Sequence, residues 1–429
     1  MKPSKYNICL PYDDRFVIFN GITKRFFLVS SQNKEAFLQI LSAPNEFKEQ
    51  YAPFLQRMAK EGFIIEDDVD ELEVIKQEYQ AKNQSEIYQI MIMPTYSCNV
   101  SCWYCTQHHQ NICLSHSDVE IIKKHISFYI EKHHLRGIHI SWFGGEPLMG
   151  FKHIKAITSY TKEYCQKHKL EYKNTITTNG ILISRDVLKI MRDHNFVFFQ
   201  ITIDGKKDDH DKTKFIKGES AYERVMRNIC LITEILPKAE INLRYNFTKQ
   251  NLRPQDIIHD MNSYLPENVR KHIMLSIMKV WQQDENEIEK EEINKLIDLA
   301  EDSGYRTSVG GGFDTCYVDN NHFNCVYPNG KVDKCDNSEM LACRGQIAEN
   351  GDIIWNTSIS FLEHTILSSN DNECIQCPFL PMCYGPCPKE REKMSQNHSL
   401  TCRFQDKESL WFDRIYFYCK THMYHEHQK

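Results

Sequence analysis

The sequence predicts an α/β protein in which a barrel of parallel βα units is flanked by a small N-terminal domain and a cysteine-rich C-terminal region. Two observations predict this arrangement. In the middle of the chain, apolar runs of strand length alternate with amphipathic segments of helical length. Beyond about residue 305 this alternation gives way to loops, short strands and closely spaced cysteines. A chain of 429 residues is long enough for two or three such domains.

The N-terminal segment, residues 1–75, is predicted to form a winged-helix-like domain. Apolar runs at Phe16–Phe19 and Arg25–Val29 have the composition of short strands. Two short amphipathic helices follow, and a closing strand is expected at Phe63–Ile65. This domain has two candidate roles, the recognition of a peptide and a structural cap on the barrel. Residues 76–87 are predicted to be a linker because Glu, Lys and Gln dominate this stretch.

Residues 88–304 are predicted to form the barrel. Its six strand candidates are apolar runs bounded by polar segments, and they are Ile90–Met93, Ile138–Trp142, Tyr172–Thr177, Phe198–Ile203, Ile241–Asn246 and Met274–Ile277. Helical spacers between them indicate parallel strands, since parallel pairing needs long crossover connections. Six such units make a partial (β/α)6 TIM-like barrel, which would assemble an active site from the loops at the carboxyl ends of its strands.

Composition limits the classes of partner and cofactor. A formal net charge of −6 and a pI near 6.3 lack the basic footprint of nucleic-acid binding. No apolar run approaches the length that crosses a membrane, and the first residues lack the apolar core of a signal peptide. We therefore expect a cytoplasmic protein with no nucleic acid and no membrane as partner. In that reducing compartment, seventeen cysteines favour zinc or iron–sulfur binding over disulfides.

Three cysteines directly follow the first predicted barrel strand, at Cys98, Cys102 and Cys105. Three thiolates in one short loop can hold three irons of a [4Fe–4S] cube and leave the fourth iron open to a chelating substrate. The alternative is a zinc site completed by a remote histidine, such as His108 or His109. The spacing of the cysteines alone leaves both alternatives open.

The pattern CxxxCxφC, with Tyr104 as φ, resembles the radical S-adenosylmethionine (SAM) superfamily. Further pieces follow in order at strand ends. A Gly-Gly-Glu-Pro segment resembles the family's GGEP motif, whose backbone and glutamate receive the SAM amino group, and the third and fourth strands end like the family's ribose- and methionine-facing positions. The groups predicted to face SAM are Tyr104, Gly144, Gly145, Glu146, Pro147, Thr178, Asn179, Thr202 and Arg244.

The resemblance implies that a cluster-bound electron splits SAM into methionine and a 5′-deoxyadenosyl radical, which abstracts a substrate hydrogen. Arg244 is a candidate partner for the SAM carboxylate, and its alternative role is an ordinary ion pair at the barrel end. The sequence departs from the family at one place. Relatives often have H-D-x-x-R after the fourth strand, whereas this chain has His210 and Asp211 followed by Lys214. Lysine cannot reproduce the bidentate guanidinium fork.

The C-terminal region, residues 305–429, carries a second cysteine pattern and a final helix predicted at about 403–420. The pattern resembles the SPASM extension of radical SAM enzymes that modify peptides and proteins, and its positions are Cys316, Gly330, Cys335, Cys374, Cys377, Cys383, Cys387 and Cys402. The resemblance implies two auxiliary clusters. The implied ligands of the first cluster are Cys316, Cys335 and Cys387, and the implied ligands of the second are Cys374, Cys377, Cys383 and Cys402.

The fourth ligand of the first auxiliary cluster is open. Cys325 either completes that cluster or sits on the strand before the turn at Gly330, and Cys343 is a further candidate. Asp336 directly follows a cluster cysteine, as the proposed catalytic acid/base does in sulfatase-maturing relatives. Such a carboxylate could accept the proton released when a substrate radical is oxidised. Its alternative role is to cap the turn by bonding its own backbone.

Together these patterns predict a radical SAM/SPASM enzyme with three [4Fe–4S] clusters and SAM as cofactors. The predicted reaction modifies a residue of a ribosomally made peptide, by a cross-link, thioether formation, epimerisation or a similar step. The alternative enzyme is an anaerobic sulfatase-maturing enzyme that forms formylglycine, and a non-enzyme alternative is an iron–sulfur electron carrier or regulator. The expected partners are a peptide or protein substrate, with a leader peptide held by the N-terminal domain, and an external electron donor such as flavodoxin or ferredoxin.

Overall fold

The structure, a computed structural model, describes residues 1–107, 109–282, 290–337, 343–356, 373–388, 390–391, 402 and 406–427. The chain divides into two compact units, and each contains segments that are far apart in the sequence. The terminal unit comprises Met1–Gln84, Gly311–Asn321 and Ser358–Glu426. The sheet unit comprises Ser85–Gly310, His322–Thr357 and His427–Lys429. Over the described ranges, no helix has both the length and the apolar character needed to cross a membrane.

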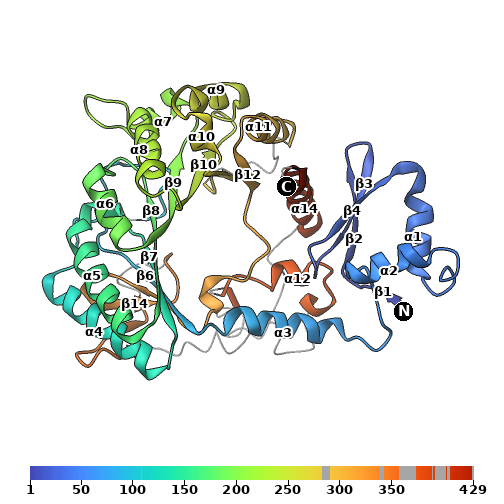
Figure 1. Ribbon diagram of the computed structural model, residues 1–429, viewed down its shortest axis with the longest axis horizontal. Coiled ribbons are helices and arrows are strands. Elements are labelled where there is room, and N and C mark those ends of the chain that lie inside the picture. Colours follow the sequence, from blue (N-terminus) through green and yellow to red (C-terminus); the bar gives the residue numbers. More distant parts are fainter. Residues whose placement is uncertain are drawn as a thin grey trace. The chain divides into compact units, whose positions relative to one another are not determined.

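The sheet unit is built on strands that pair in the order of the chain (Figure 1). The six central strands are β6 (Ile87–Ile92), β7 (Gly137–Trp142), β8 (Glu171–Thr178), β9 (Phe196–Ile203), β10 (Glu240–Phe247) and β11 (Ile273–Lys279). Each is parallel to its neighbours. The α-helices that follow these strands are α4 (His116–Lys132), α5 (Phe151–His168), α6 (Arg185–Asp193), α7 (Lys207–Thr213), α8 (Ala221–Ile235), α9 (Pro254–Tyr264), α10 (Glu267–Arg270) and α11 (Lys290–Asp302).

Two further parallel strands extend this sheet at its two sides. Strand β12 (Arg306–Val309) pairs with β11, and β13 (Phe323–Val326) pairs with β6. Beyond β13 the pairing becomes antiparallel through the three short strands β14 (Lys331–Asp333), β15 (Gly345–Ile347) and β16 (Ile353–Trp355). The segment after the predicted barrel therefore continues the same sheet. Its strand β13 lies directly beside β6, the strand that precedes the three-cysteine loop.

Side chains alternate between two faces of the central strands. In β9, Phe199 and Ile201 are buried, as expected for the face that α-helices cover. Gln200 and Thr202 lie between them and stay partly exposed on the other face. Thr202 pairs in register with Arg244 of β10, which is also partly exposed. The second face of the sheet is thus polar, and the predicted SAM-facing side chains of these strands belong to it.

The terminal unit joins the N-terminal segment to the cysteine-rich segment through one core. Its strands are β2 (Asn7–Tyr12), β3 (Arg15–Asn20) and β4 (Phe26–Ser30) in one antiparallel sheet, and β1 (Lys2–Pro3) and β5 (Ile64–Ile65) in another. Its helices are α1 (Lys34–Ser42), α2 (Ala52–Lys60), α3 (Glu71–Asn83), α12 (Leu380–Cys383) and α14 (Lys407–His427). Tyr6, Ile75 and Tyr79 pack in one hydrophobic cluster with Leu380 and Tyr384. Residues near the N-terminus thereby support the segment that carries Cys374.

Candidate active site

The three-cysteine loop begins where β6 ends. Backbone bonds hold its first residues in place, because Tyr96 N–H donates to the Ile112 carbonyl at 2.9 Å. Within the loop, Cys105 N–H donates to the Cys102 carbonyl at 3.1 Å, which bends the chain so that both thiols belong to one turn. Burial, together with the nearby Glu146, Cys102 and Cys105, raises the pKa of the Cys98 thiol to about 11. The three thiols are therefore electrostatic neighbours.

The glycine pair after β7 packs against the start of this loop. Gly145 N–H donates to the Thr95 carbonyl at 3.0 Å, and Glu146 N–H donates to the Ser97 carbonyl at 2.8 Å. A side chain at Gly145 would collide with the Ser97 carbonyl oxygen, and Gly144 has a φ of 122°, which favours glycine. The two glycines thus permit the close backbone approach that fixes the loop on the end of β7.

Glu146 is completely buried, and both of its carboxylate oxygens accept hydrogen bonds. Oε1 accepts from Leu148 N–H at 3.0 Å and from the Thr178 hydroxyl at 2.8 Å, and Oε2 accepts from Asn179 N–H at 2.8 Å. Burial raises its pKa to about 7, although these three bonds favour the charged form. In this conformation Glu146 is a positioning residue that ties the end of β7 to the end of β8.

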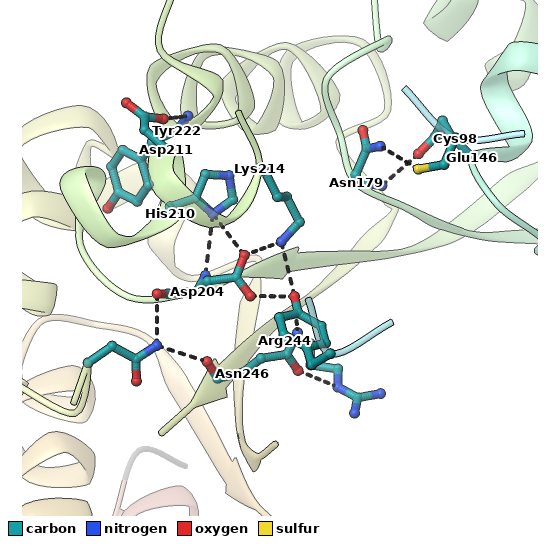
Figure 2. Close-up of polar contacts among 12 residues, drawn as sticks. Cys98, Glu146, Asn179, Asp204, His210, Asp211, Lys214, Tyr222, Arg244 and Asn246 are labelled. Carbon is teal, nitrogen blue, oxygen red and sulfur yellow. Dashed lines mark hydrogen bonds and ion pairs between the residues drawn. The ribbon is translucent and has the colours of Figure 1, made fainter. Parts of the chain in front are cut away.

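Asn179 carries this connection on to the cysteine loop (Figure 2). Its Nδ2 donates to Asn99 Oδ1 at 2.8 Å and lies 3.9 Å from the Cys98 sulfur. Its own Oδ1 accepts from Ile181 N–H at 3.0 Å, so both ends of the amide are used. The ends of β6, β7 and β8 are consequently held together by side chains that the sequence predicted to face SAM.

Tyr104, between two of the cysteines, points toward the ends of β9 and β10. Its hydroxyl donates to Asp204 Oδ1 and accepts from Asn246 Nδ2 at 3.0 Å. Lys214 donates to Asp204 Oδ2 and lies 3.4 Å from the Tyr104 hydroxyl. His210 Nδ1 is 3.5 Å from Asp204 Oδ2. Figure 2 shows Lys214 and His210 facing Asp204.

Arg244 lies on the polar face of the sheet, next to this network. Its Nε donates to Asn246 Oδ1 at 3.0 Å, and in Figure 2 its guanidinium points away from Asp204. Among the residues that the structure describes, no hydrogen bond or ion pair engages its two Nη atoms. Burial lowers the pKa of Arg244 below its ordinary value. A partly buried guanidinium with open Nη atoms suits a carboxylate ligand.

The structure thus gathers most of the predicted site. The three cysteines, Tyr104, Glu146 and Asn179 lie together at the strand ends, and Pro147 begins a 3₁₀ turn beside them. His109 lies beside the Cys105 sulfur, at 3.4 Å, while His108 is outside the described residues. Within the described ranges, no three His, Cys, Asp or Glu side chains are grouped so as to hold one metal ion.

Sequence reasoning missed the roles of Asp204, Asn246 and Lys214. The signal for Lys214 was present, because the departure from H-D-x-x-R placed a lysine four residues after His210. The sequence could not identify the residue with which Lys214 pairs. Asp204 lies at the end of β9, and only the folded loop brings the two side chains together.

In the terminal unit, the cysteines predicted for the second auxiliary cluster are neighbours. Burial, together with the nearby thiols of Cys383, Cys377 and Cys402, raises the pKa of Cys374 to about 11. Cys377 N–H donates to the Cys374 carbonyl at 3.0 Å, which folds the two onto one turn. Cys374 therefore lies near the other three predicted ligands, and Cys377 also lies near Cys402. Cys316 and Cys387 also belong to this unit.

Cys325 and Cys335 belong to the sheet unit. Cys325 lies on β13, fully buried, in a hydrophobic cluster with Tyr327 and Cys343. Burial holds its thiol pKa well above the ordinary value, and Asp336, Cys343 and Cys335 act in the same direction. The Tyr327 hydroxyl donates to the Cys335 carbonyl at 2.6 Å. Cys325 is thus both a strand residue and a close neighbour of Cys335 and Asp336.

Comparisons with known proteins agree with this geometry. The model of the radical SAM superfamily matches residues 92–260. The radical SAM cyclopropyl synthase TigE of Paramaledivibacter caminithermalis is 22% identical in an alignment that covers 91% of this chain and 86% of TigE. A cysteine-type anaerobic sulfatase-maturating enzyme of Clostridium novyi is 21% identical over 79% of this chain and 99% of its own length.

Among solved structures, native anSMEcpe with bound AdoMet and Cp18Cys peptide is similar to this chain with a TM-score of 0.55. The match covers 80% of this chain and 100% of that chain, at 17% sequence identity. At this level of identity the likeness shows a shared fold. The large parallel sheet described above is therefore common to both proteins.

Proposed function

We propose that this chain, whose residues 92–260 match the model of the radical SAM superfamily, modifies a residue of a ribosomally made peptide. The observation that carries this proposal is the set of contacts that fixes the cysteine loop on the ends of β6, β7 and β8. Residues from the loops after β7, β8 and β9 bond there to the loop that carries the three thiols. An electron carrier would need the thiols but not the polar side chains of the SAM-facing strands.

The donor set fits a [4Fe–4S] cluster. Three neighbouring thiols in one loop match a cube that keeps one iron open, and the family implies one such cluster together with SAM. Cys98, Cys102 and Cys105 would hold it. When bound, the cluster would supply the electron that splits SAM and so yields the 5′-deoxyadenosyl radical.

The polar face of the sheet would bind SAM. The open Nη atoms of Arg244 suit the SAM carboxylate, and Thr202 stands beside Arg244 in register on the same face. Gly144 and Gly145 would bring backbone groups close to the SAM amino group. The Glu146 carboxylate would hold the backbone of this turn in place through the hydrogen bonds that it accepts. In this arrangement Asn179 both orients the loop and borders the cofactor.

Two auxiliary clusters complete the proposal. The mutual proximity of the four cysteines in the terminal unit supports the second of them. For the first, the resemblance to the SPASM extension implies Cys316, Cys335 and Cys387, and Cys325, which is electrostatically coupled to Cys335, is one candidate for the fourth ligand. Asp336, next to Cys335, would accept the proton that leaves an oxidised substrate radical. An external flavodoxin or ferredoxin would supply electrons.

Two substrate classes compete for this site. The likeness to TigE, named as a cyclopropyl synthase, extends over 91% of this chain and supports peptide maturation. The likeness to a cysteine-type maturase, which spans 99% of that enzyme, supports formylglycine formation equally well, as does Asp336. Residues 1–75 favour the first class if they hold a leader peptide, because an edge strand can add a peptide strand through main-chain hydrogen bonds.

One experiment separates these possibilities. The anaerobically reconstituted chain, expected to hold about twelve irons from three [4Fe–4S] clusters, is given SAM, a reductant and one of two substrates. One is a short precursor peptide encoded beside the gene, and the other is a sulfatase peptide that contains the cysteine to be oxidised. Peptide maturation predicts a mass change in the precursor alone, and sulfatase maturation predicts formylglycine in the second. Absence of SAM cleavage with either peptide would refute both enzyme proposals.

A further inference from the structure

A buried ion pair stands directly behind the cysteine loop. Lys214, at the end of α7, is 1% exposed, and Asp204, which follows β9, is 2% exposed. Lys214 Nζ contacts Asp204 Oδ2. A lone charge at either position would be strongly destabilising, whereas the pair satisfies both groups. Such a pair is maintained at a cost in desolvation, which suggests a role beyond packing.

Tyr104 connects this pair to the loop. Its hydroxyl donates to Asp204 Oδ1, so the two carboxylate oxygens are divided between the phenol and the ammonium. Lys214 also donates to the phenol oxygen at 3.4 Å. Because Tyr104 lies between Cys102 and Cys105, an ion pair in the loop after β9 fixes the position of two thiols in the loop after β6.

Of the groups that face the Asp204 carboxylate, Lys214 supplies the positive charge that balances it. Burial would raise the pKa of Asp204, but the Lys214 charge and its hydrogen bonds hold it below the ordinary value. His210 also faces Asp204, yet burial lowers its pKa to about 3, so its ring is neutral at pH 7. Asn251 completes the group by donating to the Asp204 carbonyl at 2.8 Å.

The Lys214 charge also reaches the thiols. Lys214 Nζ lies 3.4 Å from the hydroxyl oxygen of Tyr104, the residue between Cys102 and Cys105. A positive charge near a cluster stabilises the reduced form, which carries one more electron. Replacing Lys214 by an uncharged residue therefore removes one positive charge from beside the loop.

We propose that Lys214 is a positioning residue for the catalytic cluster: through Asp204 and the Tyr104 hydroxyl it fixes the segment from Cys102 to Cys105, and its charge raises the reduction potential of the cluster that this loop binds. The inference rests on the proposed function, since it requires the cluster at these three cysteines. A lysine suits the role because its compact ammonium serves Asp204 and Tyr104 together, whereas a guanidinium fork would engage both carboxylate oxygens and displace the phenol.

The test uses the full-length, reconstituted chain and the electron paramagnetic resonance signal that changes when SAM is added. This response distinguishes the catalytic cluster from the auxiliary clusters. Lys214→Met is compared with wild type, with Lys214→Arg and with Lys212→Met, which removes the same charge from an exposed position on α7. Iron per chain and the midpoint potential of the SAM-responsive signal are measured for each protein.

We expect Lys214→Met to lose iron and SAM-responsive signal, and the remaining signal to have a more negative midpoint potential. Lys214→Arg should keep the wild-type potential because it keeps the charge, and Lys212→Met should match wild type in both measurements. If Lys214→Met does not fold, the double variant Asp204→Asn/Lys214→Met avoids the unpaired buried carboxylate. In that variant an amide oxygen still accepts from Tyr104, and both charges are removed, so its midpoint potential reports the net effect of the pair.

The inference would be overturned if Lys214→Met, or the double variant where Lys214→Met does not fold, bound as much iron as wild type and its cluster had the same midpoint potential. That result differs from failure of the proposed function. If the function is wrong, wild type itself shows no SAM-responsive cluster. If only the inference is wrong, wild type shows the signal, and the Lys214 variants cannot be distinguished from Lys212→Met.

Discussion

Replacing Glu146 with glutamine should change how the stability of this protein depends on pH. The carboxyl is fully buried, and its pKa rises from 4.5 in the unfolded chain to about 7 in the folded one. A raised carboxyl pKa means that folding takes up a proton, so this contribution to stability is complete below pH 4.5 and is lost as pH rises through 7. Wild type should therefore lose stability from this group between pH 5 and pH 8.

The size of the effect follows from the shift. Each pKa unit corresponds to about 1.4 kcal/mol, so the shift is worth about 3 kcal/mol in total. Glutamine has nearly the same shape but does not titrate. It also turns one amide N–H toward the Asn179 N–H, an unsatisfied contact that costs about 1–3 kcal/mol at every pH. Only the titrating contribution varies with pH, so the difference between the two proteins isolates it.

The assay is chemical denaturation of the reduced, cluster-free protein under anaerobic conditions at several pH values from 5 to 8. The unfolding free energy of wild type minus that of Glu146→Gln should fall by about 3 kcal/mol across this range. Glu163→Gln serves as a control, because Glu163 is exposed on α5 and its difference from wild type should stay flat. Parallel curves for wild type and Glu146→Gln would show that the carboxyl takes up no proton on folding.

The remaining predictions concern the cysteines and the N-terminal segment. Alanine at all three cysteines of the loop after β6 should remove about a third of the iron and abolish SAM cleavage; full iron or persistent cleavage would contradict the assignment. If the Cys325 thiol is a ligand, Cys325→Ala should lower the iron content of the auxiliary clusters or alter their spectrum. If the iron content and the spectrum are both unchanged, Cys325 is a strand residue and not a ligand. Deleting residues 1–75 removes Tyr6 from the core that supports Leu380, so we expect insoluble protein or loss of the nearby cluster. A soluble, cluster-loaded truncation that modifies its peptide at the original rate would refute that expectation and the leader-binding role together.

The central strands could be predicted because their signal is local. Each is a run of five or more residues with apolar positions that the sheet buries, as in β9. Strand β12 could not be predicted in this way, and for β13 the sequence indicated a strand at Cys325 but not the strand it pairs with. Each has four residues, and Phe323–Val326 is a strand because β6 offers an unpaired edge for it. That information lies in a segment more than two hundred residues earlier.

The residues of the candidate site show the same difference between local and long-range information. Residues within one motif, such as Gly145 and Glu146, could be placed at a strand end from the sequence alone. The detailed role of Glu146 could not, since its three donors come from its own turn and from the end of β8. Lys214 illustrates the limit most clearly. A motif could mark its position as unusual, but a buried lysine is acceptable only with a carboxylate in reach, and the fold supplies it.

The pairing of β13 with β6 has a consequence for how the protein is made. Gln89 pairs with Phe323, so one edge of the sheet is sealed by residues that leave the ribosome 234 positions later. Until then β6 presents an open edge, and an open edge is a site for wrong pairing between chains. Contacts so distant in sequence form slowly, because a long loop must close first. The strand that leads into the cysteine loop therefore completes its pairing late, and the loading of iron would best follow release of the whole chain.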